Sequence, residues 1–397
     1  DLPDLLADCA ATALVHAGAA PPVDCATFAC ADLSAPEAFD AVLRPGDPAQ
    51  ILYTSGTTGR PKGVRASHAN LAYGCTAGPR RLKLAHSEHF LHAYPIGTNA
   101  GQTMLINALD AYPAALCATR FTPARFARLI EEHRVGTAFV VPAMAAELLG
   151  ARVYERHDLS SLRLLGSTGA ALPPAVAAGL AAALPGATIV NYYTSTEAAP
   201  AQTTMVYDPA RPDSVGRPTA GQLRIADPDG NPVPAGEIGE VWLRCPVPRA
   251  YHGDAEANAA VFRGGWVRMG DVGHLDADGF LHLADRAGDL VKSGGHKVST
   301  LRVEAVLHEH PAVTQAAAFG VPHPVLGATV AAAVVARTEL TPVALRAFLA
   351  TRLAPYEVPN PLRVVDRLPT NNAGKVLKGE LARLFGKQDG SASGKFD

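Results

Sequence analysis

The loop at residues 53–63, YTSGTTGRPKG, constrains the fold of this chain more than any other segment. An apolar run, ILY at 51–53, enters the loop, and SHANLAYG at 67–74 predicts a helix after it, with Ser67 as the N-cap. The hydroxyls, the backbone N–H groups and the Lys62 ammonium are donors suited to a polyphosphate. An ordinary turn does not need all of these donors together. We therefore interpret the loop as a phosphate-binding segment.

Two common phosphate-binding motifs do not fit this loop. A P-loop requires G-x-x-x-x-G-K-[ST], but Lys62 follows Pro61 and precedes Gly63. The dinucleotide fingerprint G-x-G-x-x-G is absent, because Gly56 and Gly59 form only its second half. The sequence therefore argues against a P-loop NTPase and against a dinucleotide-binding enzyme.

Apolar strand-like runs alternate with helical segments along the first half of the chain. The runs at 138–142, 162–166 and 188–193 predict buried strands, and 173–184 predicts a helix that begins with prolines. This alternation favours an α/β layered core. From about residue 209, short strands are separated by proline, glycine and aspartate turns, which favours a β-rich subdomain.

A third unit begins near residue 287. It contains an amphipathic helix at 297–307, strands at 315–321 and 329–336, and a helix near 342–353. We predict an α/β fold class with a large amino-terminal domain of α/β layers plus the β-rich subdomain, and a small α+β carboxy-terminal domain. The predicted boundaries are 1–285 for the large domain, with its β-rich subdomain at about 209–285, then 286–386 for the small domain and 387–397 for a disordered tail.

Charge and composition argue against several classes of protein. A net charge of −2 over 397 residues gives no basic surface for nucleic acid. The apolar run at 328–336 falls short of the roughly 18 residues that indicate a membrane span, and the start of the chain lacks a signal-peptide pattern. The six cysteines form no C-x-x-C pair, so we expect reduced thiols and a cytoplasmic protein. His308 and His310 match no metal-binding spacing and are expected at the surface or at a helix end.

Six later segments accompany the phosphate-binding loop. They are GSTGAAL at 166–172, NYYTSTE at 191–197, GEIGEVWLR at 236–244, WVRMGDVG at 266–273, DRAGDLVKSGGHKVS at 285–299 and LPTNNAGKVLK at 368–378. With these motifs the chain resembles the adenylate-forming superfamily of acyl- and aryl-CoA synthetases, adenylation domains of nonribosomal peptide synthetases, and luciferases. It is most similar to an AMP-dependent acyl-CoA synthetase. The resemblance extends from about Asp47 to Leu384.

The resemblance implies a reaction in two steps. A carboxylic acid joins AMP and releases pyrophosphate, and the acyl group then passes to the thiol of CoA, so ATP, Mg²⁺ and CoA are the expected cofactors. Glu197 would hold the metal, and Lys375 would bridge the incoming carboxylate and the α-phosphate. The implied catalytic residues are Lys62, Thr196, Glu197 and Lys375. The implied cofactor-binding residues are Thr54, Ser55, Gly56, Thr57, Thr58, Gly59, Gly169, Ala170, Ala171, Tyr193, Asp271, Arg286, Gly294 and Gly295.

The resemblance also implies that the small domain turns between the two steps. One orientation would bring Lys375 to the site, and the other would replace it with the loop at 292–296, which lines the tunnel of the thiol. The swivel position aligns with Gly288, and glycine permits the necessary change of dihedral angles. Tyr193 would pack on adenine, and Asp271 would bind the ribose hydroxyls.

Departures from the family pattern bear on the substrate. The stretch at 93–102 has Gly97-Thr98 where many acyl-CoA members carry a histidine, and no aspartate lies between His92 and Asp110 to pair with the ammonium of an amino acid. We therefore expect a small-molecule carboxylic acid other than an α-amino acid, in the fatty acid metabolism typical of acyl-CoA synthetases. Family members carry on the order of a hundred residues ahead of the loop, so we also expect an amino-terminal truncation.

Three functions stay open at this point. The first is an ATP-dependent acid–thiol ligase that makes an acyl-CoA, which the absence of an appended carrier domain favours. The second is a stand-alone adenylating enzyme that loads a carrier protein in trans or forms an amide. The third is a degenerate nucleotide-binding homologue, which Gly288 and the short front of the chain motivate.

Overall fold

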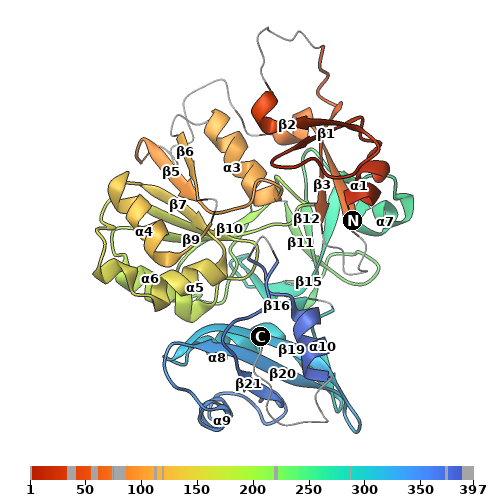
Figure 1. The fold of residues 1–397 in the computed structure, drawn as a ribbon. Coiled ribbons are helices and arrows are strands. Elements are labelled where there is room, and N and C mark those ends of the chain that lie inside the picture. The colour runs from red at the N-terminus through yellow and green to blue at the C-terminus, as the bar shows by residue number, and fades with distance from the viewer. Residues whose placement is uncertain are drawn as a thin grey trace.

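The computed structural model describes residues 2–33, 42–54, 61–73, 75, 86–110, 114–118, 120–218, 222–286, 288–371 and 374–386. It has a large domain and, below it in Figure 1, a small carboxy-terminal domain drawn in blue. This arrangement confirms the predicted fold class, while the boundaries at 285 and 386 stay predictions. The predicted site residues Ser55, Gly56, Thr57, Thr58 and Gly59 and the predicted tail at 387–397 lie outside the described residues.

A six-stranded sheet forms the centre of the large domain. Its strand order is β10-β9-β8-β7-β5-β6, and every neighbouring pair is parallel except β9 and β10. The strands predicted at 138–142, 162–166 and 188–193 are confirmed as β7, β8 and β9, with ends shifted by at most two residues. The strands are β5 (His89–His92), β6 (Ala114–Cys117), β7 (Thr137–Val140), β8 (Leu164–Thr168), β9 (Thr188–Tyr193) and β10 (Thr203–Val206).

Helices cover both faces of this sheet (Figure 1). Helices α4, α5 and α6 bury Phe126, Leu148 and Leu180 in the main core on one face, and α3 packs over Phe90 and Phe139 on the other. A proline stands in the first turn of α4, α5 and α6, where its missing N–H costs no hydrogen bond. These helices are α3 (Asn99–Asp110), α4 (Pro123–Glu132), α5 (Pro142–Gly150) and α6 (Pro174–Ala183), and the short 3₁₀ helix η2 (Val153–Glu155) follows α5.

The phosphate-binding loop connects two antiparallel strands, β3 (Pro48–Thr54) and β4 (Lys62–Ser67). Ser67 caps the following helix, as predicted, by accepting a hydrogen bond from the Asn70 N–H, but this helix, α2 (His68–Leu71), ends before residue 74. The sequence pattern missed β4, which places Lys62 opposite Thr54 in the ladder. The neighbouring elements are β13 (Ala250–Tyr251), which pairs with β4, and α1 (Leu2–Asp8), β1 (Ala13–His16), β2 (Ala26–Ala29) and η1 (Cys30–Asp32) ahead of β3.

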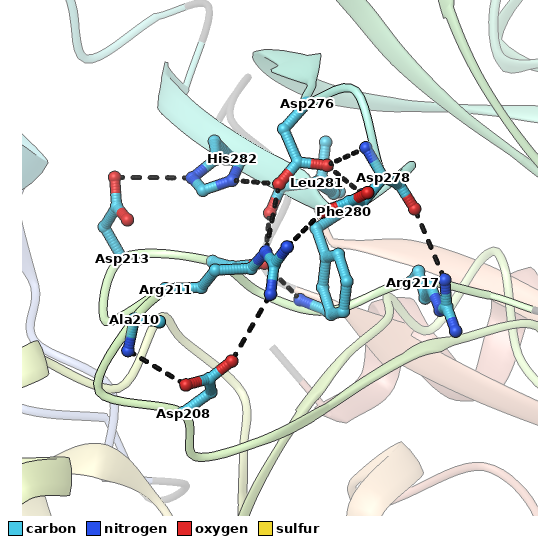
Figure 2. A network of polar contacts seen from close by, with 12 residues as sticks. Asp208, Ala210, Arg211, Asp213, Arg217, Asp276, Asp278, Phe280, Leu281 and His282 are labelled. Carbon is cyan, nitrogen blue, oxygen red and sulfur yellow. Dashed lines mark hydrogen bonds and ion pairs between the residues drawn. The ribbon is translucent and has the colours of Figure 1, made fainter.

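An antiparallel sheet forms the β-rich part of the large domain. Figure 2 shows a polar network that closes the turn between its strands β15 and β16, in which Arg211 contacts the carboxylates of Asp208, Asp276 and Asp278. His282 Nε2 lies 3.4 Å from Asp276 Oδ2, so the network ties the segment at 208–211 to both strands of the hairpin. The elements are β11 (Leu223–Ala226), β12 (Gly239–Arg244), α7 (Ala255–Val261), β14 (Phe262–Arg263), β15 (Trp266–Leu275) and β16 (Leu281–Arg286).

The small domain has its own sheet, in the order β18-β17-β20-β19, with β21 parallel to β20. Helices α8 and α9 bury Leu307 and Leu345 on one face, and α10 packs Phe385 against Phe319 on the other. The elements are β17 (Val291–Ser293), β18 (His296–Val298), α8 (Thr300–His308), β19 (Val313–His323), β20 (Gly327–Ala336), α9 (Pro342–Ala350), β21 (Leu362–Val364) and α10 (Lys378–Gly386).

The first helix of the small domain starts later than the sequence predicts. Residues up to Val298 pair with β17, and Ser299 caps α8 by accepting from the Arg302 N–H, so the helix expected at 297–307 begins at Thr300. His308 ends α8, as expected. Across the described residues, no three His, Cys, Asp or Glu side chains gather in a way that could hold a metal. No helix in the described part of the chain is long and apolar enough to cross a membrane.

Candidate active site

Three of the predicted site residues meet where β9, β15 and β16 come together. Asp271 on β15 lies opposite Arg286 on β16 in the ladder. Tyr193 Oη donates to Asp271 Oδ2 at 2.6 Å, and Arg286 Nε lies 3.4 Å from Asp271 Oδ1. We call Tyr193, Asp271 and Arg286 the Asp271 cluster.

Within the Asp271 cluster, the carboxylate is buried, Tyr193 is half-buried and Arg286 is exposed. Asp271 is 7% exposed. Burial raises the pKa of its carboxyl, and the Arg286 charge and the Tyr193 hydrogen bond act against that rise. Burial also raises the pKa of Tyr193 well above its ordinary value, so the phenol keeps its proton and serves as a donor. The cluster therefore offers carboxylate oxygens together with a nearby guanidinium, which suits the hydroxyls and phosphate of a nucleotide.

Lys375 reaches the Asp271 cluster from the small domain. Burial and the positive charge of Arg286 lower the pKa of its ammonium, while the charges of Asp289 and Asp271 raise it. The loop is held by two 2.9 Å hydrogen bonds between Lys375 and Asn371, one from each backbone N–H. A Cβ on Gly374 would lie 3.3 Å from Val141 Cγ2, so this loop packs directly against the residue that precedes α5.

A second group forms around Tyr251, on β13. Thr196 and Glu197 follow β9 on a turn, and Tyr251 Oη donates to Glu197 Oε1 at 3.0 Å. Lys62 Nζ lies 5.1 Å from the centroid of the Tyr251 ring, within cation–π range. Thr54 pairs with Lys62 across the β3–β4 ladder. The structure thus brings all three predicted catalytic residues of the large domain to one edge.

Arg249 also belongs to this group, although none of the sequence motifs predicted it as a site residue. It is 7% exposed and touches three separate segments: Nε donates to Asn70 Oδ1 at 2.8 Å, and Nη1 donates to Asn99 Oδ1 and to the Thr196 carbonyl, both at 2.9 Å. Burial lowers its pKa to about 10. Arg249 directly precedes β13, two residues before Tyr251, and the two side chains bond to neighbouring residues of one motif, Thr196 and Glu197. That spacing is the only signal in the sequence that could have pointed to Arg249.

Gly169, Ala170 and Ala171 follow β8 at the same edge of the sheet. Gly169 has φ +97°, a conformation that favours glycine. A Cβ on Gly169 would lie 3.6 Å from Val141 Cγ1, so this segment and the Lys375 loop flank the same valine. Ala170 is exposed and Ala171 half-buried, which leaves this wall of the site open to a ligand.

Gly294 and Gly295 lie apart from the other predicted residues. They turn the chain between β17 and β18 with φ +54° and +91°. A Cβ on Gly294 would lie 2.8 Å from Leu326 Cδ2, so the tip of this hairpin packs on the turn between β19 and β20 of the small domain. In this orientation of the small domain, Lys375 is close enough to the Asp271 cluster for the charges of Asp271 and Arg286 to act on its pKa.

Four cations and two carboxylates therefore lie in the two groups just described. The cations are Lys62, Arg249, Arg286 and Lys375, and the carboxylates are Glu197 and Asp271. A cationic edge attracts a polyphosphate, and it also lowers the repulsion between a carboxylate and a phosphate that must react with each other.

Family comparison agrees with this geometry. The AMP-binding enzyme family model matches residues 5–251, and the model for the AMP-binding enzyme C-terminal domain matches residues 302–375. The chain belongs to the AMP-binding enzyme family. The family predicted from the motifs is confirmed.

Relatives of this AMP-binding enzyme include CoA ligases. It is 38% identical over 350 residues to a feruloyl-CoA synthase of Amycolatopsis sp, a match that covers 85% of this chain and 70% of that protein. It is 35% identical over 347 residues to the 2-succinylbenzoate–CoA ligase of Geobacillus kaustophilus, covering 86% and 70%. Among solved structures, the amide bond synthetase McbA from Marinactinospora thermotolerans superposes with a TM-score of 0.72 at 32% identity, covering 84% and 69%.

These matches confirm the predicted class of reaction. This AMP-binding enzyme is an AMP-forming acid–CoA ligase. The acids named for the two ligases are aromatic, so the expectation of fatty acid metabolism is not supported.

Proposed function

We propose that this AMP-binding enzyme activates an aromatic carboxylic acid with Mg²⁺ and ATP, and passes the acyl group to CoA. The observation that carries the acid class is a group of aromatic side chains on the α3 face of the sheet. Tyr192 points to the opposite face from Tyr193, because successive strand residues alternate. There it joins Phe90, Tyr94 and Phe139 in a cluster beneath α3.

Gly166 lets two of these rings lie close over β8. A Cβ at this position would stand 2.7 Å from Phe139 Cδ1 and 3.0 Å from Tyr192 Cε2. The ring centroids of Phe139 and Tyr192 are 6.4 Å apart, and the angle between the ring planes is 41°. Phe90, Tyr94 and Phe139 are buried, so the half-buried Tyr192 is the ring that a substrate would contact. A flat aromatic acid gains contact energy against such a ring beyond its buried area, which a flexible aliphatic chain does not. Burial raises the pKa of Tyr192 to about 12, so its phenol remains a donor at neutral pH for a polar group on the substrate ring.

Glu197 is the proposed ligand of Mg²⁺. This cation prefers carboxylate oxygens and commonly binds through one or two carboxylates together with substrate phosphates. Glu197 carries such oxygens, and Tyr251 engages Oε1. Lys62 lies over the Tyr251 ring, so its ammonium would add a second positive charge beside the one that the metal would supply. The metal would neutralise part of the triphosphate charge.

The positions of the side chains support the remaining proposed roles. Lys375 would bind the incoming carboxylate and the α-phosphate, and Asp271 with Arg286 would bind the ribose and phosphate. The Gly294–Gly295 hairpin would meet the thiol only after the small domain turns about Gly288. All six cysteines are free thiols, which supports the proposal of a reducing, cytoplasmic compartment.

Acid-dependent exchange of pyrophosphate into ATP tests this proposal. The panel contains ferulate, 2-succinylbenzoate, oxalate and fatty acids of several lengths, with Lys375→Ala as the inactive control. We expect an aromatic acid to support at least about tenfold faster exchange than any other class, and Tyr192→Leu to raise KM for that acid more than KM for ATP. Faster exchange with oxalate or a fatty acid would contradict the acid class, and no exchange with any acid would contradict the function.

The likeness to an amide bond synthetase supports a second candidate function. In it, the acyl-AMP would pass its acyl group to an amine. A competition experiment separates the two candidate functions. The enzyme receives purified acyl-AMP with equal concentrations of CoA and a panel of amines, and mass spectrometry measures the products. A dominant thioester supports the first proposal, and a dominant amide supports the second.

A further inference from the structure

The chain passes from the large domain to the small one directly after Asp285 and Arg286. Both residues belong to β16, which pairs with β15 in the large domain. Val291 begins β17, which pairs with β18 and β20 of the small domain. Asp285 is therefore one of the last residues held by the large domain, and it is 1% exposed.

Asp285 and its neighbour accept hydrogen bonds from the start of α8 in the small domain. Asp285 Oδ2 accepts from the Thr300 N–H at 2.5 Å, and Oδ1 accepts from Thr300 Oγ1 at 3.3 Å. The Ala284 carbonyl accepts from Ser299 Oγ at 2.6 Å. We call these four residues, Ala284, Asp285, Ser299 and Thr300, the latch.

The negative charge of Asp285 interacts favourably with the amino-terminal end of α8. The first N–H groups of a helix have no acceptor within the helix, and the helix dipole makes this end positive. Burial raises the pKa of Asp285, and the N–H groups of Arg286 and Thr300 act against that rise. A small domain that turned away would take the Thr300 donor with it and leave Asp285 without this bond. The latch therefore stabilises one orientation of the small domain over others.

Lys378 connects the latch to the loop that carries the catalytic lysine. Lys378 Nζ lies 2.8 Å from Glu304 Oε1 on α8, donates to Thr300 Oγ1 at 3.1 Å, and lies 3.8 Å from Asp289 Oδ2. Lys378 is the first residue of α10 and follows Lys375 by three positions. The start of α8 and the Lys375 loop are thus joined within the small domain.

We propose that Asp285 is a positioning residue, which holds the small domain in the orientation that places Lys375 at the Asp271 cluster. This inference rests on the ligase function proposed above. Asp285 acts through Thr300 and touches no reacting atom. Its loss should therefore slow acyl-AMP formation, which needs this orientation, and spare thioester formation from supplied acyl-AMP, which does not.

Two substitutions remove the latch in different ways. Asp285→Asn replaces the charged acceptor with a side chain of the same shape. Thr300→Pro removes the N–H donor at the first position of α8, where proline is tolerated, and Ser299 already has the extended backbone that precedes a proline, with ψ 121°. Asp276→Asn is the matched control. This carboxylate lies at the far end of the same hairpin, and the interactions that the structure records for it all belong to the network of Figure 2.

The orientation can be measured without catalysis. Gln315 Nε2 on β19 donates to Glu147 Oε1 on α5 at 2.9 Å, which is a second contact between the two domains. In the Glu147→Cys/Gln315→Cys protein, a short bis-maleimide joins positions 147 and 315 only when the domains meet in this way. Mass spectrometry of the digested protein distinguishes this link from links to the native cysteines.

We expect Asp285→Asn and Thr300→Pro to lower the 147–315 link several-fold, and Asp276→Asn to leave it unchanged. We also expect both latch variants to slow acid-dependent pyrophosphate exchange roughly tenfold, the effect of losing a hydrogen bond to a charged group, with thioester formation within about threefold of the parent. Circular dichroism and melting temperature confirm that each variant is folded.

An unchanged link in folded latch variants would overturn the proposal, as would an equal loss of both half-reactions. If the parent protein exchanges pyrophosphate with no acid, the ligase function fails, and the cross-link still supports or overturns the latch.

Discussion

At the scale of single residues, burial controls the charges at the site. Lys375 and Arg249 are cations whose pKa values burial lowers, and Asp271 is a carboxylate whose pKa burial raises. In each case burial disfavours the charged form, and a bound anion or cation would favour it again. The free enzyme is therefore most sensitive to pH at the residues proposed to meet the ligand.

We predict that kcat/KM for adenylation falls on the alkaline side as Lys375 loses its proton. Burial places the pKa of this lysine below its ordinary value of 10.5, so the decline begins below that pH. The ordinary pKa of arginine is higher than that of lysine, so Lys375→Arg should move the alkaline decline to higher pH, whatever activity it retains. The folded protein should also gain stability as pH rises here, because the unfolded chain binds this proton more tightly. Identical alkaline limbs in the parent and Lys375→Arg would contradict the assignment.

We predict that Tyr251→Phe raises the Mg²⁺ concentration needed for half-maximal exchange. The variant keeps the ring under Lys62 and removes only the hydroxyl that holds Glu197. Loss of a residue that orients a metal ligand costs about 10- to 100-fold in metal affinity or activity. Tyr207→Phe, at a tyrosine packed against the main core, is the control and should leave the Mg²⁺ dependence unchanged. An unchanged dependence in Tyr251→Phe would remove Tyr251 from the metal site.

At the scale of elements, the two-residue strand β13 organises the site. Ala250 and Tyr251 pair with Arg65 and Val64 of β4, the strand that leaves the phosphate-binding loop. Arg249, directly before the strand, donates to the Thr196 carbonyl, and Tyr251, on the strand, donates to Glu197. Arg249 also bonds to Asn99, the first residue of α3. The strand and the residue before it thus fix Thr196 and Glu197 relative to β4 and to the start of α3.

We predict that Arg249→Met destabilises the protein by about 2–4 kcal/mol. The thioether fills much of the same space but leaves the oxygens of Asn70, Asn99 and Thr196 without this donor, and a buried polar group that loses its partner costs about 1–3 kcal/mol. Urea denaturation measures the change. Arg244→Met, at an exposed arginine on β12, should stay within about 0.5 kcal/mol of the parent. A similarly small change in Arg249→Met would show that its contacts contribute little.

At the scale of the whole molecule, the sequence predicted the residues of the site better than their connections. Lys375, Asp271 and Arg286 lie in motifs that the sequence shows directly, and in the structure the charges of Asp271 and Arg286 act on the pKa of Lys375. Arg249 could not be found in this way, because its partners Asn70 and Asn99 are 179 and 150 positions away. Contacts of this range depend on how sheets and helices pack, which no local pattern specifies.

The same limit applies to the arrangement of the two domains. The motif at 285–299 indicated a crossing point between domains, but the bond from Thr300 to Asp285 depends on which way the small domain faces. The sequence also predicts the start of α8 three residues too early, because residues up to Val298 pair with β17 and Ser299 caps the helix. The periodicity of apolar residues predicted the fold class, whereas only the structure gave the orientation of the small domain.

Separate measurement of the two half-reactions in Lys375→Ala tests the central claim most directly. We predict at least about a 10²-fold loss of acid-dependent pyrophosphate exchange, the scale expected when one group that stabilises transition-state charge is removed. Thioester formation from supplied acyl-AMP and CoA should remain within about threefold of the parent, because that step does not use Lys375. Equal loss of both half-reactions, or full exchange without the lysine, would contradict the role given to Lys375 and to this orientation of the small domain.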